Sequence, residues 1–303
     1  MALPACCSDA DRQARDARAV VRPLTSQKRR PTRSSGIARS WRSHGGAGST
    51  TLAMTRYDRI GAGYAGTRRE DPDLRRRIQA ALRDARTVVN VGAGAGSYEP
   101  RDRHVVAIEP SDVMAAQRPR ELAPAIRATA DALPLRDGAV DAAMAVLTIH
   151  HWDDARERGV RELRRVARGP VVIVTYDAAV AGRMWLMGYL PEVAELDARI
   201  FPPTEEVCGW LGGRARVEVV PIARDTPDWT LGSFWAHPER VLDPAARAAT
   251  SGFARMPEHV VDRVARAVAA DLASGAWDER HGGLRDLHAY DAGMRLIVTE
   301  PAS

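Results

Sequence analysis

The chain has 303 residues, of which 45% are hydrophobic and 27% charged, a balance typical of a globular protein with a sizeable core. No apolar run reaches the ~20 residues that a membrane-spanning helix needs, so we expect no such helix. Three cysteines (Cys6, Cys7 and Cys208) exclude a disulfide framework and a cysteine-rich zinc module. We therefore expect a cytoplasmic protein without a metal site.

The net charge of +5 comes from residues 1–53, which hold ten basic and three acidic residues, and the remainder is slightly acidic. This segment is rich in Arg, Ser, Gly and Pro and lacks a hydrophobic pattern, which predicts disorder. Three interpretations stay open: an arm that binds nucleic acid, a targeting peptide, and an upstream extension without a role before a start at Met54. The third is favoured, because 43 Arg against one Lys indicate a G+C-rich gene in which spurious upstream reading frames stay open.

Regular hydrophobic patterns begin near residue 57 and predict one domain over residues 54–303. Two short helices come first, and Asp71 or Asp73 is the expected N-cap of the second. Segments typical of strands then alternate with helices, of which the first covers residues 153–167. The seven predicted strands cover residues 87–92, 104–109, 125–129, 139–149, 170–177, 215–222 and 294–300.

This alternation predicts an α/β fold, with a seven-stranded, mainly parallel sheet and helices on both of its faces. The run over residues 170–177 is almost wholly apolar, as expected for a central strand covered on both faces. Residues 228–290 are mainly helical and contain a clear amphipathic helix over residues 258–273. They predict a helical cap or insertion near the C-terminus.

A glycine-rich loop follows the first predicted strand. It reads Asn-Val-Gly-Ala-Gly-Ala-Gly, with glycines at 92, 94 and 96, and allows a ligand to approach the backbone closely. Glu109 ends the second strand, where an acidic side chain can accept hydrogen bonds from both hydroxyls of a ribose. The pair predicts a site for an adenosine-containing cofactor. The spacing is GxGxG rather than GxGxxG, with Ser97 after the third glycine, which disfavours NAD.

These residues resemble the class I S-adenosylmethionine-dependent methyltransferases, and more narrowly the type 11 group related to the ubiquinone and menaquinone biosynthesis methyltransferases. Three further stretches carry the resemblance: residues 128–138 are similar to the loop after the family's third strand, 140–152 to its fourth strand, and 162–166 to the helix before its fifth strand. The similar region covers about residues 55–180. The resemblance implies a Rossmann-like fold, S-adenosylmethionine as cofactor, and in-line methyl transfer to an acceptor.

The resemblance also implies roles for single residues. Gly92, Gly94 and Gly96 would lie under the methionine and ribose portions of the cofactor, and Glu109 would hold the ribose hydroxyls. The pair Ala130 and Asp131 would lie beside the adenine, with Asp131 accepting a hydrogen bond from its amino group. Further implied contacts at the adenine edge, near the sulfonium and on the N-terminal helix over the cofactor come from Ser111, Met114, Leu147, Thr148, Tyr64 and Arg68.

Two positions depart from the family's pattern. Asn90 stands where many relatives have Asp, so its contact toward the ligand's amino group would be weaker or would pass through water. Thr129 occupies a place that is often acidic in relatives, which bears on the role of Asp131.

His150 and His151 follow the predicted fourth strand, on the sheet edge where ligands bind in open α/β folds. One interpretation makes either histidine the general base that takes a proton from a hydroxyl acceptor. The favoured alternative is that the two histidines and Trp152 brace the turn between strand and helix.

The acceptor itself has no motif in the sequence. After the fourth strand stands His-His-Trp-Asp, with neither an NPPY-like tetrapeptide nor a Pro-Cys nucleophile, so we expect a small-molecule acceptor rather than nucleic acid or a membrane. Two alternatives stay open. One is a catalytically silent relative that binds the cofactor or a partner, and the other is a nucleic-acid methyltransferase recruited by residues 1–53. Nothing in the sequence indicates an oligomeric state.

Overall fold

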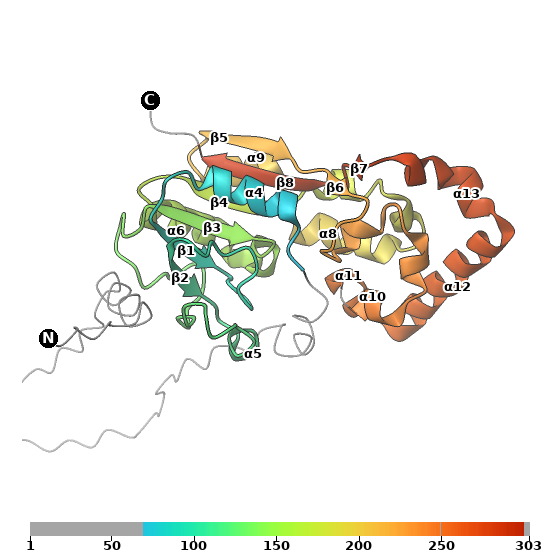
Figure 1. Ribbon diagram of the computed structural model, residues 1–303, viewed down its shortest axis with the longest axis horizontal. Helices are drawn as coiled ribbons and strands as arrows, with labels where there is room; N and C mark the ends of the chain where they lie inside the picture. The colour runs from blue at the N-terminus through green and yellow to red at the C-terminus, as the bar shows by residue number, and fades with distance from the viewer. Residues whose placement is uncertain (1–68, 249, 300–303) are drawn as a thin grey trace, which may run out of the picture.

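A six-stranded sheet runs through the computed structural model, which describes residues 69–248 and 250–299 (Figure 1). Its strands are β1 (Thr87–Val91), β2 (His104–Ile108), β3 (Ala142–Val146), β4 (Val171–Tyr176), β5 (Ala215–Val219) and β8 (Met294–Thr299). Their order is β2-β1-β3-β4-β8-β5, with β2, β1, β3 and β4 parallel and β8 antiparallel to both of its neighbours. The predicted α/β fold with a mainly parallel sheet is confirmed. Residues 1–53, Tyr64 and Arg68 lie outside the described residues, and so do the predictions made for them.

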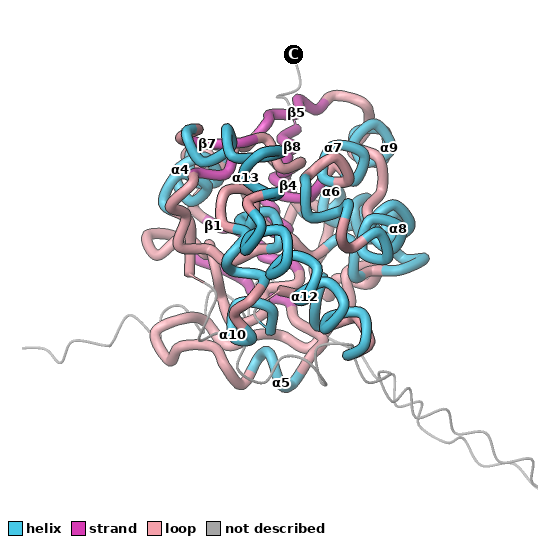
Figure 2. Tube along the Cα trace, turned by 90° about the vertical axis from the view of Figure 1, so that its right-hand side faces the viewer, coloured by secondary structure: helices cyan, strands magenta, loops and turns pink. Residues whose placement is uncertain are grey.

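Both faces of the sheet are covered by helices. Successive strand residues point to opposite sides, and apolar residues on each side pack against a helix. The covering helices are α4 (Pro72–Ala81), α6 (Arg156–Val166) and α9 (Thr204–Trp210). On one face Val89 belongs to a buried apolar cluster with Leu163 of α6. On the other face its neighbour Val88 belongs to a second cluster, with Ile78 of α4. Figure 2 shows α4 on one side of the strands and α6 and α9 on the other.

The helix α4 begins as the sequence predicts for the second of the two N-terminal helices. Of the two candidate caps, Asp71 is the N-cap, and its side chain accepts hydrogen bonds from the backbone N–H groups of Asp73 and Leu74. Pro72 occupies the first helical position, where a missing N–H has no consequence.

Two strand predictions were wrong in extent. Residues 125–129 form no strand but a single parallel bridge between Ile126 and Ile108, so the sheet has six strands instead of seven. Pro124 supplies no N–H to a ladder, and Ile126 lies at the partly exposed margin of the sheet, where additional pairing would gain little. The predicted strand over 139–149 is shortened to β3, because the chain turns sharply at Leu147 and enters a 3₁₀ turn, η1 (Ile149–His151).

A set of short helices covers the carboxyl ends of the strands at one end of the molecule (Figure 1). We call residues 178–200 and 231–286 the cap. The first part holds α7 (Ala178–Ala181), η3 (Trp185–Gly188) and α8 (Pro191–Ile200). The second part holds η4 (Leu231–Phe234), η5 (Pro238–Val241), α10 (Pro244–Ala248), α11 (Ser251–Ala254), α12 (Glu258–Ser274), α13 (Ala276–His281) and η6 (Gly282–Asp286).

The cap is joined to the sheet by a continuous apolar core. Trp185 of η3 meets Trp277 of α13 edge to face at 5.4 Å, and both belong to the cluster that contains Val88 and Val172 of the sheet. The remaining short elements are α5 (Asp112–Ala115), η2 (Asp153–Ala155) and a two-stranded ribbon of β6 (Ile222–Ala223) and β7 (Ala289–Tyr290).

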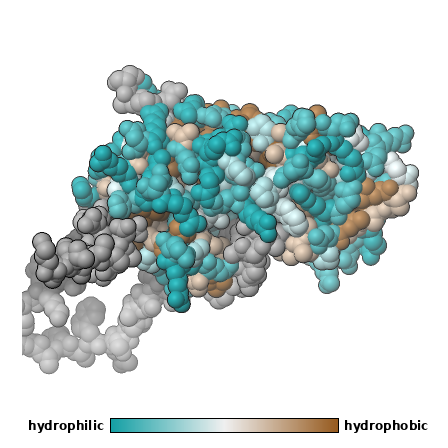
Figure 3. Space-filling model, in the orientation of Figure 1, coloured by the Kyte–Doolittle hydropathy of each residue, from teal (hydrophilic) through white to brown (hydrophobic). Residues whose placement is uncertain are grey.

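The outer surface in this view is mainly hydrophilic, with apolar atoms gathered over α12 (Figure 3). Among the described residues, no helix has both the length and the apolar character that crossing a bilayer requires.

Candidate cofactor and acceptor site

The glycine loop leaves β1 and folds back against the end of β2. The N–H groups of Gly92 and Ala93 both donate to the carbonyl of Ile108, at 2.9 and 3.0 Å. All three glycines have left-handed backbones, with φ of 72°, 50° and 96° at positions 92, 94 and 96. L-residues rarely adopt this conformation, so the tight turn depends on glycine.

Close packing adds a second requirement for glycine in this loop. A β-carbon at position 92 would lie 2.1 Å from the Thr148 hydroxyl, and one at position 96 would lie 2.2 Å from the Leu122 side chain. At Gly94 the nearest side-chain atom would be the terminal methyl of Met114, at 3.3 Å. The loop is therefore enclosed by the turn after β3 on one side and by the region of α5 on the other.

Glu109 holds the loop from the end of β2. Its Oε2 accepts from the N–H of Gly94 at 2.8 Å, and its Oε1 accepts from the N–H of Ser111 at 2.8 Å. The Ser111 hydroxyl then caps α5 by accepting from the N–H of Met114. Glu109 is thus a fixed carboxylate at the end of β2, and a carboxylate can accept hydrogen bonds from the hydroxyls of a ribose. The structure thus brings Gly94, Glu109, Ser111 and Met114 together, as the sequence predicts.

Asn90 supplies a buried acceptor beside the loop. Its Nδ2 donates to Glu99 Oε1 at 3.0 Å, while its Oδ1 is buried without a hydrogen-bond partner among the described residues. A buried polar atom without a partner is destabilising and is rare in native proteins. A ligand that brings an N–H donor to this end of β1 would satisfy the Asn90 oxygen.

The partner of Asn90 is part of an ion pair that sequence reasoning missed. Arg118 donates to both oxygens of Glu99, at 3.0 and 2.9 Å, and its other nitrogen donates to the Gly94 carbonyl at 3.2 Å. Both side chains are almost fully buried. The pair is thus linked to the glycine loop through the Gly94 carbonyl and to β1 through Asn90. In the sequence, nothing marks Glu99 and Arg118 as partners except their opposite charges, because neither lies in a recognisable motif.

Ala130 and Asp131 lie in the loop before β3. Ala130 is buried and faces the helix α6 at Gly159, whereas Asp131 is half-buried. A hydrogen bond from Thr129 lowers the pKa of Asp131, helped by Arg158, whose guanidinium lies 3.2 Å away. Asp131 is therefore a carboxylate that is already held in place from within the chain.

The turn after β3 connects the glycine loop to the region under the cap. Leu147 has a φ of 52°, an uncommon value for a residue with a side chain, and lines the cavity described below. Thr148, the next residue, packs on Gly92. One strained turn thus places Leu147 in the wall of the cavity and Thr148 against the glycine loop. Backbone strain of this kind is frequent at functional sites.

The rings of the two histidines of η1 are in contact, tilted by 48° with their centroids 3.8 Å apart. His150 is buried and stacks on Phe201 at 4.3 Å, while His151 Nδ1 lies 3.1 Å from the guanidinium of Arg255 in the cap. Both predicted residues are therefore beside the sheet edge, and His150 lines the cavity.

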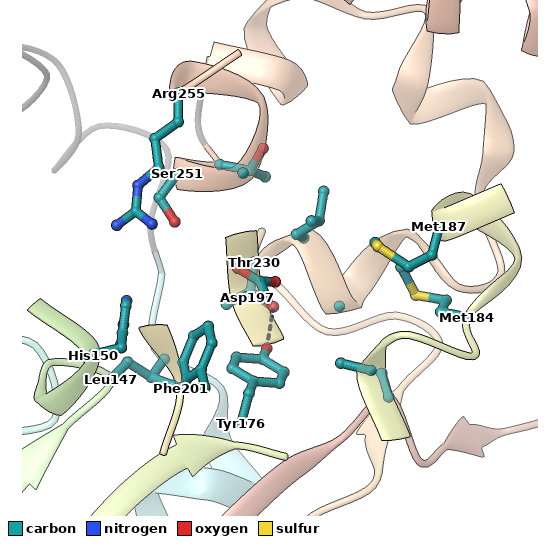
Figure 4. Close-up of a pocket in the computed structure, with 16 residues that line it drawn as sticks. Leu147, His150, Tyr176, Met184, Met187, Asp197, Phe201, Thr230, Ser251 and Arg255 are labelled. Carbon is teal, nitrogen blue, oxygen red and sulfur yellow. Dashed lines mark hydrogen bonds between the residues drawn. The ribbon is translucent and has the colours of Figure 1, made fainter. Parts of the chain in front are cut away.

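A cavity of about 750 Å³, counting its part open to solvent, separates the sheet edge from the cap (Figure 4). Apolar and aromatic side chains dominate its lining, among them Phe201 and Tyr176, which meet edge to face at 5.8 Å. Its charged members are Asp197 of α8 and Arg255 at the end of α11. Sequence reasoning did not find these residues, because they lie outside every motif.

Asp197 has an unusual environment for a carboxyl group. Burial raises its pKa to about 6, and the positive charge of Arg255 counteracts only part of this effect. Within the described residues, no cluster of three His, Cys, Asp or Glu side chains has the arrangement of a metal site.

Comparisons with known proteins bear on this geometry. A family model described as a methyltransferase domain matches residues 89–174. A solved structure from Anabaena variabilis, described as a candidate methyltransferase from an antibiotic biosynthesis pathway, is 30% identical, with a TM-score of 0.72 and coverage of 78% of this chain and 99% of that chain.

Two further solved structures are similar at lower levels. A methyltransferase from Thermotoga maritima, described as a possible histamine N-methyltransferase, is 22% identical, with coverage of 56% of this chain and 85% of that chain and a TM-score of 0.41. The geranyl diphosphate C-methyltransferase of Streptomyces coelicolor is 15% identical, with coverage of 76% and 79% and a TM-score of 0.44. None of the curated protein sequences matches the chain.

Proposed function

Because the chain belongs to the type 11 family of class I S-adenosylmethionine-dependent methyltransferases, we propose that it methylates a small molecule held between the sheet and the cap. The observation that carries this proposal is the turn at Leu147 and Thr148. It places the glycine loop on one side and a largely apolar cavity of about 750 Å³ on the other. Such cavities, with few polar groups, are typical of small-molecule sites.

S-adenosylmethionine, the cofactor of this family, supplies a methyl group on a positively charged sulfur when it is bound. The residues of the loop fit this molecule. Glu109, at the end of β2 beside the glycine loop, is placed to accept from the ribose hydroxyls, and the buried Asn90 Oδ1 suits the ammonium group of the methionine portion. Asn in place of Asp keeps the acceptor but removes its charge, which weakens this one contact.

The adenine contacts follow from the same placement. We assign its edge to Ser111 and Met114 and its other border to Ala130 and Asp131. The proposed contacts of Tyr64 and Arg68 with the methionine carboxylate remain predictions, because both residues lie outside the described part of the chain.

In-line transfer requires the acceptor atom to approach the methyl carbon from the side opposite the sulfur. The chain contributes by orienting the acceptor and by excluding water from the space between sheet and cap. Leu147, Phe201 and the cap methionines Met184 and Met187 form the apolar part of that enclosure. Residues that bind the cofactor are thus separate from those that hold the acceptor.

His150 is the histidine that borders the cavity, whereas His151 contacts Arg255. The proposal that either histidine acts as general base applies only if the acceptor carries a proton that must leave. The stacking of His150 on Phe201 also supports the bracing role, in which the histidine shapes one wall.

The small-molecule acceptor is supported by the cavity and by the Anabaena relative, which is described as belonging to antibiotic biosynthesis. Residues 69–248 and 250–299 have no excess of basic over acidic charge comparable to that of residues 1–53, which disfavours a nucleic-acid acceptor. We place the reaction in the cytoplasm, where the three cysteines would stay reduced.

Calorimetric titration of the full chain with S-adenosylhomocysteine tests the proposal. We expect saturable binding, no binding of NADH, and a loss of at least tenfold in affinity for Glu109→Ala, because two charge-assisted hydrogen bonds to the ribose disappear. Glu205→Ala, at an exposed position of α9, is the matched control and should bind as the unchanged chain does. A folded chain without measurable binding would contradict the proposed function.

A further inference from the structure

Asp197 is the one acidic residue among the sixteen that line the cavity (Figure 4). Among the described residues, its carboxyl group receives no hydrogen bond and forms no close ion pair, and its neighbours act on it only through burial and the charge of Arg255. A carboxyl group kept away from water without a partner is destabilising. Its acceptor capacity is therefore available to a molecule in the cavity.

The other polar groups of the lining are largely engaged within the chain. The Tyr176 hydroxyl donates to Thr230 Oγ1 at 2.9 Å, and the Thr250 hydroxyl donates to the Arg247 carbonyl at 3.1 Å. Figure 4 shows Arg255 extending toward the side of the cavity where His150 and Phe201 lie. Asp197 is thus the strongest acceptor that remains for an occupant.

The charges of the cavity limit the occupant further. Asp197 and Arg255 are the acidic and the basic side chain of the lining, and their charges offset each other when Asp197 is ionised. An ammonium or a carboxylate group on the acceptor would each meet one charge of the wrong sign. The aromatic rings of Phe201 and Tyr176, which both line the cavity, offer flat apolar contact instead.

We propose that the methyl acceptor is a neutral, planar compound with a phenol-type hydroxyl group, and that Asp197 accepts the proton of this hydroxyl during transfer. This inference rests on the proposed function. The acceptor oxygen forms a bond to the methyl carbon as the carbon–sulfur bond breaks, and the sulfur keeps the electron pair. The hydroxyl proton moves to the Asp197 carboxylate and then to solvent, so charge and atoms balance.

The proposal predicts a loss of rate at low pH. Asp197 accepts a proton only when ionised, and its raised pKa of about 6 places the loss near that value. The other ionisable groups that border the cavity are Arg255, His150 and Tyr176, and His151 contacts Arg255. Of the elements that meet α8, α7 and η3 carry no ionisable side chain. The helix α12 brings Arg263, which is paired with Glu192, and α6 brings Arg156, which donates to the carbonyl of Ile200.

Three probes with the same ring system test the class of acceptor: 2-naphthol, 2-naphthylamine and 2-naphthoate. Transfer of labelled methyl from S-adenosylmethionine by the full chain should be at least tenfold faster to 2-naphthol than to the other two. Asp197→Asn should lower kcat for 2-naphthol by about 10²-fold, the contribution typical of a positioned base. The affinity for S-adenosylhomocysteine should not change.

Two further variants separate a catalytic role from a structural one. Glu195→Gln, at an exposed position of the same helix, should retain the rate and the fall in kcat/KM near pH 6. Asp197→Glu keeps the carboxyl group and should retain that fall, whereas Asp197→Asn should lose it.

The inference is overturned if Asp197→Asn keeps the full rate or keeps the fall in kcat/KM near pH 6. It is also overturned if 2-naphthylamine or 2-naphthoate is methylated faster than 2-naphthol. Transfer to none of the three probes by a chain that binds S-adenosylhomocysteine also overturns it. A folded chain that does not bind S-adenosylhomocysteine contradicts the proposed function instead.

Discussion

Glu109 and Asn90 illustrate how differently two residues of one site depend on the rest of the chain. Glu109 acts on the backbone of Gly94 and Ser111, so a local motif predicts its position and its partners. Asn90 depends on Glu99, which in turn depends on Arg118, a residue 19 positions further along the chain. A local pattern cannot predict such a pairing, because it is selected by the packing of the folded loop.

The charge of Asp197 has a consequence for stability that can be measured without any acceptor. A carboxyl group whose pKa is raised in the folded state binds protons more tightly there than in the unfolded chain, so it destabilises the fold increasingly as pH rises from the unfolded value of ~3.9 to about 6, and fully above that value. We expect Asp197→Asn to increase the free energy of unfolding at pH 7.5 by about 1 kcal/mol, allowing for partial solvent screening.

Urea unfolding at pH 5 and pH 7.5 checks this expectation. The gain from Asp197→Asn should shrink at pH 5, where the native carboxyl is mostly protonated. Glu195→Gln should show no gain at either pH. A variant less stable than the unchanged chain at pH 7.5 would mean that Asp197 has a stabilising partner.

At the scale of elements, one carboxylate ties together the beginnings of three parallel strands. Asp141, just before β3, accepts from the backbone N–H groups of Arg86 and Thr87 at the start of β1, at 3.0 and 2.9 Å. Its other oxygen accepts from Arg168, just before β4, at 2.5 Å. Burial opposes ionisation, but these hydrogen bonds lower the pKa of Asp141 to about 2.

Asp141→Asn should therefore destabilise the protein in a pH-dependent way. A carboxylate whose pKa is lowered in the folded state stabilises it above the unfolded value of ~3.9, and this contribution is lost as pH falls toward 2. We expect a loss of about 1–2 kcal/mol at pH 7 after allowance for the partly exposed site.

Urea midpoints at pH 7 and pH 3 provide the measurement. The difference between Asp141→Asn and the unchanged chain should narrow at pH 3. Asp154→Asn, at an exposed position, is the control and should change neither midpoint. An equal loss at both pH values would show that the side-chain shape matters rather than its charge.

The elements themselves were the best-predicted feature of the fold. The strand β4 and the helix α12 follow from apolar runs that depend on neighbours in sequence. The predicted strand at residues 125–129 was wrong, since its extent depends on how much of it the sheet margin buries and on Pro124. The end of β3 at Val146 also escaped prediction, because the turn that follows it depends on the packing of Thr148 on Gly92, in the loop after β1.

Over the whole molecule, sheet and cap share one core. Trp277 of α13 is fully buried, and the cluster to which it belongs extends through Met144 and Val172 to Ile78 of α4. Polar contacts reinforce this connection, since Arg156 of α6 donates to the carbonyl of Ile200 at 2.8 Å and the guanidinium of Arg255 lies 3.1 Å from His151. These contacts predict that sheet and cap unfold together.

Trp277→Ala tests the cooperativity. We expect a loss of about 3–5 kcal/mol, as is usual for removing a buried aromatic ring, and a single transition with coincident midpoints by far-UV circular dichroism and tryptophan fluorescence. Leu287→Ala, at a side chain that is 42% exposed, should change stability by less than about 0.5 kcal/mol. A separate early transition of the cap would contradict a shared core.

The position of the cavity under the cap was the feature least accessible to sequence reasoning. Its walls come from the turn after β3, the end of β4, α8 and α11, which are far apart in the chain. No periodicity or motif links Asp197 to Arg255. The proximity of Gly94, Glu109, Ser111 and Met114 was predictable, because these residues follow one another along a single stretch of the chain.

This division has an evolutionary consequence. Of the sixteen residues that line the cavity, only Leu147 and His150 belong to the stretch that also builds the glycine loop and its surroundings. Substitutions in the other fourteen alter the shape and polarity of the cavity while leaving the proposed cofactor contacts untouched. Descendants of such a gene are free to diverge in the compounds they modify without passing through forms that have lost the methyl donor.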